Sequence, residues 1–302
     1  MNWVSSLRAQ DTPVTRKNAA DIGVLYPVSS EGALSRQYTN TISLSLIDGI
    51  SGNITALSLG GFGTVVKDSL HGAQVAGFFN TASRVRGAQV AGFINIDSEL
   101  HGAQVAGFMN CASTVHGFQA AGFLNKATTV HGVQLAGFIN IADSSDYPIG
   151  VVNFIRNGEK SIDLSVDETS TFLAAFRSGG RLLYGIAGIG YNGKDNRSLY
   201  ALEAGIGAHF RIAPAFRLNA EVTSLTMADF KSGTYFKSSL GLFPAYRLGH
   251  HVELFAGPTF NRINWSKRLG EGLGSSFLWS KTKGTDFSGL SLGASGGIRA
   301  IF

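Results

Sequence analysis

Two patterns of apolar and polar residues run along the chain. Between residues 71 and 145, a unit of the form GxQxAGFxN recurs five times at intervals of fifteen residues. From about Leu182 onward, longer segments alternate, as in ALEAGIGAHFRI, where apolar residues from Leu202 to Ile212 take every second position. A period of two places successive side chains on opposite faces of a strand, so both patterns predict β-structure.

The two faces of the repeated unit differ in how much they vary. Gly72, Gln74, Ala76, Phe78 and Asn80 recur unchanged on one face, whereas the other face varies among apolar residues. A surface that packs on its own neighbours requires particular shapes and hydrogen bonds, so we expect the invariant face to be interior and the variable face to meet lipid or a second layer. The predicted interior rows are Gln74, Gln89, Gln104, Gln119 and Gln134, with Asn80, Asn95, Asn110, Asn125 and Asn140.

The strands of the C-terminal third are typical of a transmembrane barrel. They reach about twelve residues and carry one apolar face and one polar or glycine face, as tilted membrane strands do. The last segment, LSLGASGGIRAIF, ends at Phe302 on the apolar face and resembles the C-terminal targeting strand of bacterial outer-membrane proteins. Charges of the opposite face are predicted to line a lumen as a constriction or as mutual pairs: Glu203, Arg211, Arg217, Glu221, Lys237 and Arg299.

Composition narrows the class of protein. Only 15% of residues are charged and 39 are glycine, yet no segment approaches eighteen consecutive apolar residues, so the sequence predicts no membrane helix. The net charge of +5 comes without a basic cluster, which argues against nucleic-acid binding. The single cysteine, Cys111, cannot form an internal disulfide or a cysteine-based zinc site.

Neither a zinc motif nor a phosphate loop is found in the sequence. GFGTVVK, which begins like a phosphate loop, lacks the GK[ST] element. We therefore expect no enzyme activity, cofactor or metal. The histidines of the repeats are interpreted as polar residues at strand starts, because Arg86 interrupts the series: His71, His101, His116 and His131.

Three stretches carry a resemblance to a known family. They are YPVSSEGALSRQYTNTISLSLIDGIS, the GxQxAGFxN units, and IGVVNFIRNGEKSIDLSVDETSTFLAAFRSGGRLLYGIAGIGY. Together they resemble the surface-repeat-containing outer-membrane proteins of Gram-negative bacteria, of the Bacteroidetes type, over roughly residues 21–302. The resemblance implies export, a β-rich surface protein and no established enzymatic activity.

The predicted architecture is all-β. We expect a signal-peptide remnant or disordered segment at 1–10, an N-terminal segment at 11–38, and an antiparallel transmembrane barrel of about 16–18 strands at 39–302, with the repeats at 71–145 inside it. Equal spacing without insertions also fits a β-solenoid with Gln and Asn ladders, joined to a smaller barrel of about eight strands.

The functional expectation follows from this architecture. It is an integral protein of the bacterial outer membrane with a structural, channel or surface-interaction role. The alternatives are a surface-displayed solenoid adhesin anchored by a small barrel and, more remotely, a barrel-embedded hydrolase. The expected partners are membrane lipid and, through the C-terminal strand, the barrel-assembly machinery.

Overall fold

The computed structural model describes the chain except for residues 1–15, 181, 195–198, 230–232 and 274–275. The chain divides into two compact units, residues 1–135 and 136–302. The predicted export segment at 1–10 lies outside the described residues. Within the described part, no helix has the length and apolar character needed to cross a membrane.

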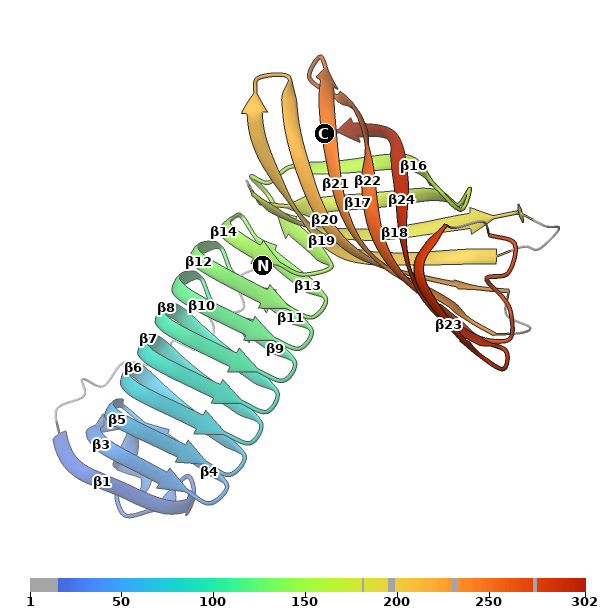
Figure 1. Cartoon of the computed structure of the whole chain (residues 1–302). Coiled ribbons are helices and arrows are strands. Elements are labelled where there is room, and N and C mark those ends of the chain that lie inside the picture. The colour runs from blue at the N-terminus through green and yellow to red at the C-terminus, as the bar shows by residue number, and fades with distance from the viewer. Residues whose placement is uncertain (1–15, 181, 195–198, 230–232, 274–275) are drawn as a thin grey trace. The chain divides into compact units, whose positions relative to one another are not determined.

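The first unit is a β-solenoid whose coils stack in parallel (Figure 1). Fifteen-residue spacing puts each residue beside its own counterpart, as in the pairs Gln89–Gln104 and Gln104–Gln119. Its elements are β1 (Arg16–Leu25), β2 (Val28–Ser29), the 3-10 helix η2 (Gly32–Gln37), β3 (Tyr38–Ser45), β4 (Asp48–Ser51), β5 (Asn53–Gly60), β6 (Gly63–Ala76), β7 (Phe79–Ala91), β8 (Ile94–Ala106), β9 (Met109–Cys111), β10 (Thr114–Ala121), β11 (Leu124–Lys126) and β12 (Thr129–Ala136).

Each coil bends at the glycine and phenylalanine of the AGF motif. Strand β8 ends at Ala106, Gly107 and Phe108 form the bend, and β9 begins at Met109. The bend interrupts the alternation, so Phe108 is 38% exposed and not interior as its position in the repeat predicts. The interior is filled instead by the alanine before the bend, by the amide rows and by one aliphatic residue per coil, such as Leu100.

The first glycine of each unit permits close stacking of the coils. Gly102 has a φ of 139°, and a Cβ built on it would lie 1.9 Å from the carbonyl oxygen of Gly87 in the preceding coil. An L-residue rarely adopts this φ, and the contact is far inside the van der Waals distance. Glycine is therefore required at this position for the fifteen-residue stack to form.

The second unit begins with a final coil and continues as a barrel. In the coil, β13 pairs in parallel with β15, with Ile139 beside Val152. The elements of this unit are β13 (Ile139–Ala142), β14 (Ser144–Ile149), β15 (Val152–Ile155), β16 (Lys160–Asp167), β17 (Phe172–Gly179), β18 (Leu183–Asn192), β19 (Leu199–Ala213), β20 (Phe216–Ala228), β21 (Tyr235–Leu248), β22 (Val252–Trp265), β23 (Phe277–Lys283) and β24 (Asp286–Ile301).

The barrel is closed and antiparallel, with eight strands in the order β16-β17-β18-β19-β20-β21-β22-β24. Pairing of β24 with β16, which puts Arg299 beside Asp163, closes the ring, and β23 adds to one edge of β24. The all-β class and the closed barrel are confirmed, and the strand arrangement is that of the alternative, a solenoid with a smaller barrel.

The predicted strand number of 16–18 and the start of the barrel at residue 39 are corrected. The barrel begins at Lys160, because the repeats pair in parallel and lie outside its ring. An up-and-down barrel needs antiparallel neighbours with joints at alternating ends. Identical coils can instead stack so that each residue lies beside its counterpart in the next coil, which extends every amide row.

The two ends of the barrel differ in their connections. At the end that we call the short-turn end, strands are joined by residues 180–182, 214–215 and 249–251, and the chain arrives there at Lys160. At the opposite, long-loop end, the connections are residues 168–171, 193–198, 229–234 and 266–285, the last of which includes β23.

Candidate functional site

The barrel has a polar interior and an apolar exterior. Strand β16 shows the division: Asp163 is fully buried, whereas Ile162 and Leu164 are 49% and 59% exposed on the outside. The same division holds around the ring. Apolar side chains at least 45% exposed on the exterior include Ile189, Leu202, Ile206, Phe210, Ile212, Val222, Leu240, Leu242, Tyr246, Leu248, Leu254, Leu292 and Ile298. A water-soluble barrel would bury such side chains, so this exterior fits lipid.

An ion-pair network fills the interior on the side of the short-turn end. Arg177 donates from Nε and Nη2 to the two carboxylate oxygens of Glu221, at 3.1 and 2.8 Å, and also pairs with Asp163. Arg299 donates to Glu253 at 3.0 Å and to Glu221 at 3.3 Å. Because these charges are buried, they are stable in the lumen only when they are paired.

A second cluster lies toward the long-loop end. The ammonium of Lys237 pairs with Asp167 and with Glu168, the latter at 3.2 Å, and Asn261 donates to Glu168 at 3.0 Å. Beyond it, apolar side chains pack into a core that includes Leu269 and Leu273 of the longest connection. The remaining members of this core are Leu173, Leu199, Ala201, Leu225, Met227, Tyr235 and Ile263.

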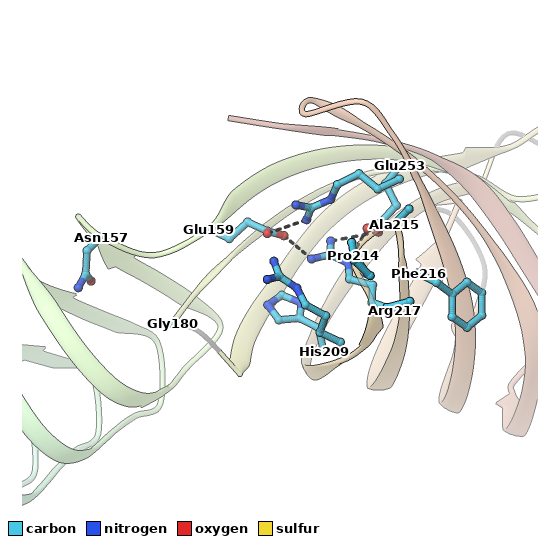
Figure 2. Close-up of a pocket in the computed structure, with 12 residues that line it drawn as sticks. Asn157, Glu159, Gly180, His209, Pro214, Ala215, Phe216, Arg217 and Glu253 are labelled. Carbon is cyan, nitrogen blue, oxygen red and sulfur yellow. Dashed lines mark hydrogen bonds and ion pairs between the residues drawn. The ribbon is translucent and has the colours of Figure 1, made fainter.

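These side chains close the lumen to solutes. Between the two clusters, a cavity of about 40 Å³ is lined by Arg177, Glu203, Glu221 and Lys237 among others, which leaves room for water molecules only. A larger cavity of about 460 Å³ opens at the short-turn end. Glu159 lies in its wall and pairs with Arg217 at 2.7 Å and with Arg247 at 3.0 Å. Figure 2 shows Glu159 and Arg217 in this cavity.

The six predicted lumen charges are placed differently by the structure. Arg217, Glu221, Lys237 and Arg299 are buried in the interior, and each is ion-paired. Glu203 is half-buried beside the small cavity, whereas Arg211 is exposed at the end of β19 and lines the larger one. Of the two predicted arrangements, the structure has mutual pairing, with no open constriction among the described residues.

Sequence reasoning missed several members of the network. Asp167, Arg177 and Glu253 are buried partners of the predicted charges, and the buried Asp163 pairs with Arg177. A signal was present in β16, where SIDLSVD alternates polar and apolar residues and places Asp163 and Asp167 on one face. Strands β16 and β17 have only eight residues each, so alternation within them is a weak indicator of a barrel strand.

The predicted amide rows form ladders inside the solenoid. All ten Gln and Asn side chains are fully buried. From Gln89 onward, each glutamine amide donates to the glutamine of the preceding coil, at 2.7 Å from Gln89 to Gln74 and 2.8 Å from Gln119 to Gln104, and the first glutamine of the row donates to Thr64. Asn95 donates to Asn110 at 2.9 Å and to the carbonyl of Val105 at 2.8 Å. The ladders satisfy buried amides, so they have a structural role and do not line a channel.

One carboxyl group lies within these ladders. Asp97 takes the interior position that is alanine in the neighbouring coils, at Ala82 and Ala112, and it is 7% exposed. Burial raises the pKa of this carboxyl group well above its usual range, although a hydrogen bond from Gln89 acts in the opposite direction. Gln104 also donates to Asp97.

The repeat histidines are exposed. His116 and His131 lie near the starts of β10 and β12, as predicted, whereas His71 and His101 lie in the middle of the longer strands β6 and β8. The rings of His101, His116 and His131 stack at 4.6 and 5.0 Å. Within the part of the chain that the structure describes, no group of three or more His, Cys, Asp or Glu side chains has the geometry to hold a metal ion.

Comparison with known proteins finds little. No family model matches the chain, and no curated protein matches it. Two solved chains match, of which one comes from a structure entitled "De novo design of transmembrane beta-barrels", at 15% identity, over 48% of this chain and 96% of that chain, with a TM-score of 0.30. Because that score is low, the description of the barrel rests on its own strand pairing.

Proposed function

We propose that this chain is an integral protein of a bacterial outer membrane, in which the eight-stranded barrel is an anchor for the solenoid. The observation that carries the proposal is the inverted polarity of the barrel, with charged side chains paired inside and apolar side chains exposed outside. Strands β19 to β22 have 13 to 15 residues, enough to cross a bilayer when tilted.

The proposed role is structural or interactive. A filled lumen argues against a channel, and the sequence has no zinc motif, phosphate loop or basic cluster. The solenoid is then the part that meets a partner. Strand β24 closes the barrel by pairing with both β16 and β22, which supports a role for this strand in recognition by the barrel-assembly machinery.

The proposal is tested by fractionation and by migration on a denaturing gel. We expect the protein in outer-membrane fractions, with migration that changes on heating, because a closed barrel resists detergent. Deletion of residues 297–302 removes most of the pairing between β24 and β16 and is expected to abolish this behaviour. Recovery of the intact chain as a soluble monomer without detergent would contradict the proposal.

The sidedness of the solenoid follows from the ends of the barrel. Bacterial barrels have short turns on the periplasmic side and longer loops outside. The final coil leads into the barrel at the short-turn end, through residues 156–159. This connection favours a solenoid on the periplasmic side over the surface-displayed adhesin.

Labelling of intact cells tests this orientation. In a Cys111→Ser background, a membrane-impermeant maleimide is expected to label Arg268→Cys in the longest loop and to leave Arg84→Cys in the solenoid unlabelled until the outer membrane is permeabilised. Both side chains are exposed, at 66% and 58%. Labelling of residue 84, but not of residue 268, in intact cells would indicate the adhesin orientation.

A further inference from the structure

One edge of the solenoid is apolar in successive coils. At each bend the phenylalanine is 38% to 50% exposed, and the rings stack on one another at 4.7 to 5.1 Å. The residue after it is a half-buried apolar side chain of the short strand. We call these side chains the apolar edge: Phe62, Phe78, Phe93, Phe108 and Phe123, with Phe79, Ile94, Met109 and Leu124.

The opposite edge of the same coils is polar. Arg84 pairs with Asp68 at 2.5 Å, and Glu99 pairs with His101 at 2.8 Å, all of them exposed. The solenoid is thus amphipathic along its length. A protein surrounded by water on all sides rarely exposes a continuous apolar strip of this kind, so the strip indicates an interaction surface.

The residues of the apolar edge indicate what covers it. The second column contains Phe79, Ile94, Met109 and Leu124, which share apolar character but not shape. A protein partner packs by shape complementarity, whereas lipid chains require only an apolar surface. Lys126, two residues after Leu124 on the short strand β11, is exposed beside the edge, where a cation complements anionic lipid headgroups.

The final coil connects this kind of surface to the exterior of the barrel. Within the second unit, Phe154 of β15 is 47% exposed and pairs in register with Ile141 of β13. Its ring lies 6.4 Å from that of Phe176 on β17. Phe176 alternates with the inward Arg177 and therefore faces outward, close to the short-turn end. At Phe154 the final coil therefore lies next to the apolar exterior of the barrel.

We propose that the apolar edge of the solenoid docks on the surface of the bilayer that holds the barrel, with its phenylalanine rings at the level where headgroups meet acyl chains. The proposed occupant is lipid, and a second copy of the chain is the competing one. This inference rests on the proposed function, since it needs the barrel in a membrane.

Spin labels on the full chain, reconstituted in phosphatidylethanolamine–phosphatidylglycerol vesicles, test the inference. In a Cys111→Ser background, nitroxides are placed singly through Phe93→Cys on the apolar edge, Arg84→Cys on the polar edge and Leu240→Cys on the barrel exterior. Accessibility to oxygen, which concentrates in lipid, is compared with accessibility to a water-soluble nickel chelate. We expect an oxygen-to-nickel ratio at 93 that is close to that at 240 and well above that at 84.

Three other outcomes are informative. A lipid signal at 240 with a water signal at 93 overturns docking and leaves the membrane anchor intact. A water signal at 240 overturns the anchor itself. Shielding of 93 from both reagents, with spin–spin broadening that disappears on dilution with unlabelled protein, identifies a second copy as the occupant and overturns lipid docking.

Discussion

Arg177 and Glu221 form a two-point ion pair between β17 and β20, strands that are not neighbours in the sheet. Their pairing crosses the interior of the barrel and brings together charges that are 44 residues apart in the sequence. Glu221 also accepts from Tyr184 at 2.7 Å and from Arg299 at 3.3 Å. One carboxylate thus holds three buried side chains, and it is the centre of the lumen network.

Replacement of this carboxylate is expected to weaken the barrel. Glu221→Ala leaves Arg177 and Arg299 buried in the lumen with fewer counter-charges, so the free energy of unfolding should fall by about 3–5 kcal/mol. Glu221→Gln retains the side-chain volume and should lower the free energy of unfolding by a smaller amount. The measurement is urea unfolding in detergent micelles, with the exposed Arg211→Ala as the control. Equal stability of Glu221→Ala and the control would contradict the role of the network.

Substitution of a coil glycine is expected to disrupt the solenoid. Gly102→Ala introduces a Cβ that would lie 1.9 Å from the carbonyl oxygen of Gly87, so adjacent coils must separate. The matched control is Ala120→Val, at an outward position where Val105 occupies the preceding coil. Hydrogen exchange of residues 85–120 should accelerate strongly in Gly102→Ala and remain unchanged in the control. Unchanged exchange in both variants would mean that the stack tolerates the added methyl group.

Interruption of the asparagine ladder is expected to lower the free energy of unfolding, because it leaves buried polar groups without hydrogen-bond partners. Asn110→Ala removes the acceptor of Asn95 and the donor to the carbonyl of Ala120. Each buried polar group without a partner costs about 1–3 kcal/mol. Thr114→Ala, at a half-buried position of the next strand, is the control. Thermal unfolding followed by circular dichroism compares the two, and an equal effect would argue against the ladder as a source of stability.

The buried carboxyl group of Asp97 is expected to make the solenoid less stable as pH rises. Its pKa is raised in the folded chain, so the folded state binds the proton more tightly than the unfolded state, whose pKa is about 3.9. Stability is then fully present below the unfolded pKa and falls as pH rises through the folded value. Each pKa unit by which the folded value exceeds the unfolded value lowers the free energy of unfolding at high pH by about 1.4 kcal/mol.

Asp97→Asn tests this pH dependence. The amide cannot ionise, so the variant should be more stable than the parent at pH 7 and should lose the decline between pH 4 and neutrality. Glu99→Gln, on the exposed side of the same coil, serves as the matched control. Hydrogen exchange of residues 89–104, corrected for its intrinsic pH dependence, provides the measurement. A decline that persists in Asp97→Asn must come from another group.

The sequence by itself determined the periods of this protein. Fifteen-residue identity defines the coil, and the invariance of Gln104 and Asn110 at their repeat positions indicates the interior, because hydrogen-bonded ladders require one residue type at every level. Strict alternation in the C-terminal third likewise determined which face of β19 to β22 is apolar. These properties are local to each strand and its neighbours in the chain.

Only the tertiary structure decided the direction of pairing and the course of the chain at the bends. A period of two is the same in parallel and antiparallel strands, so the pattern could not separate a coil from a barrel strand. The bend at Gly107 turns Phe108 outward although its parity predicts an inward side chain. The pairing of Arg177 with Glu221 was equally hidden, because it depends on closure of the ring, which brings strands distant in sequence to opposite sides of one small lumen.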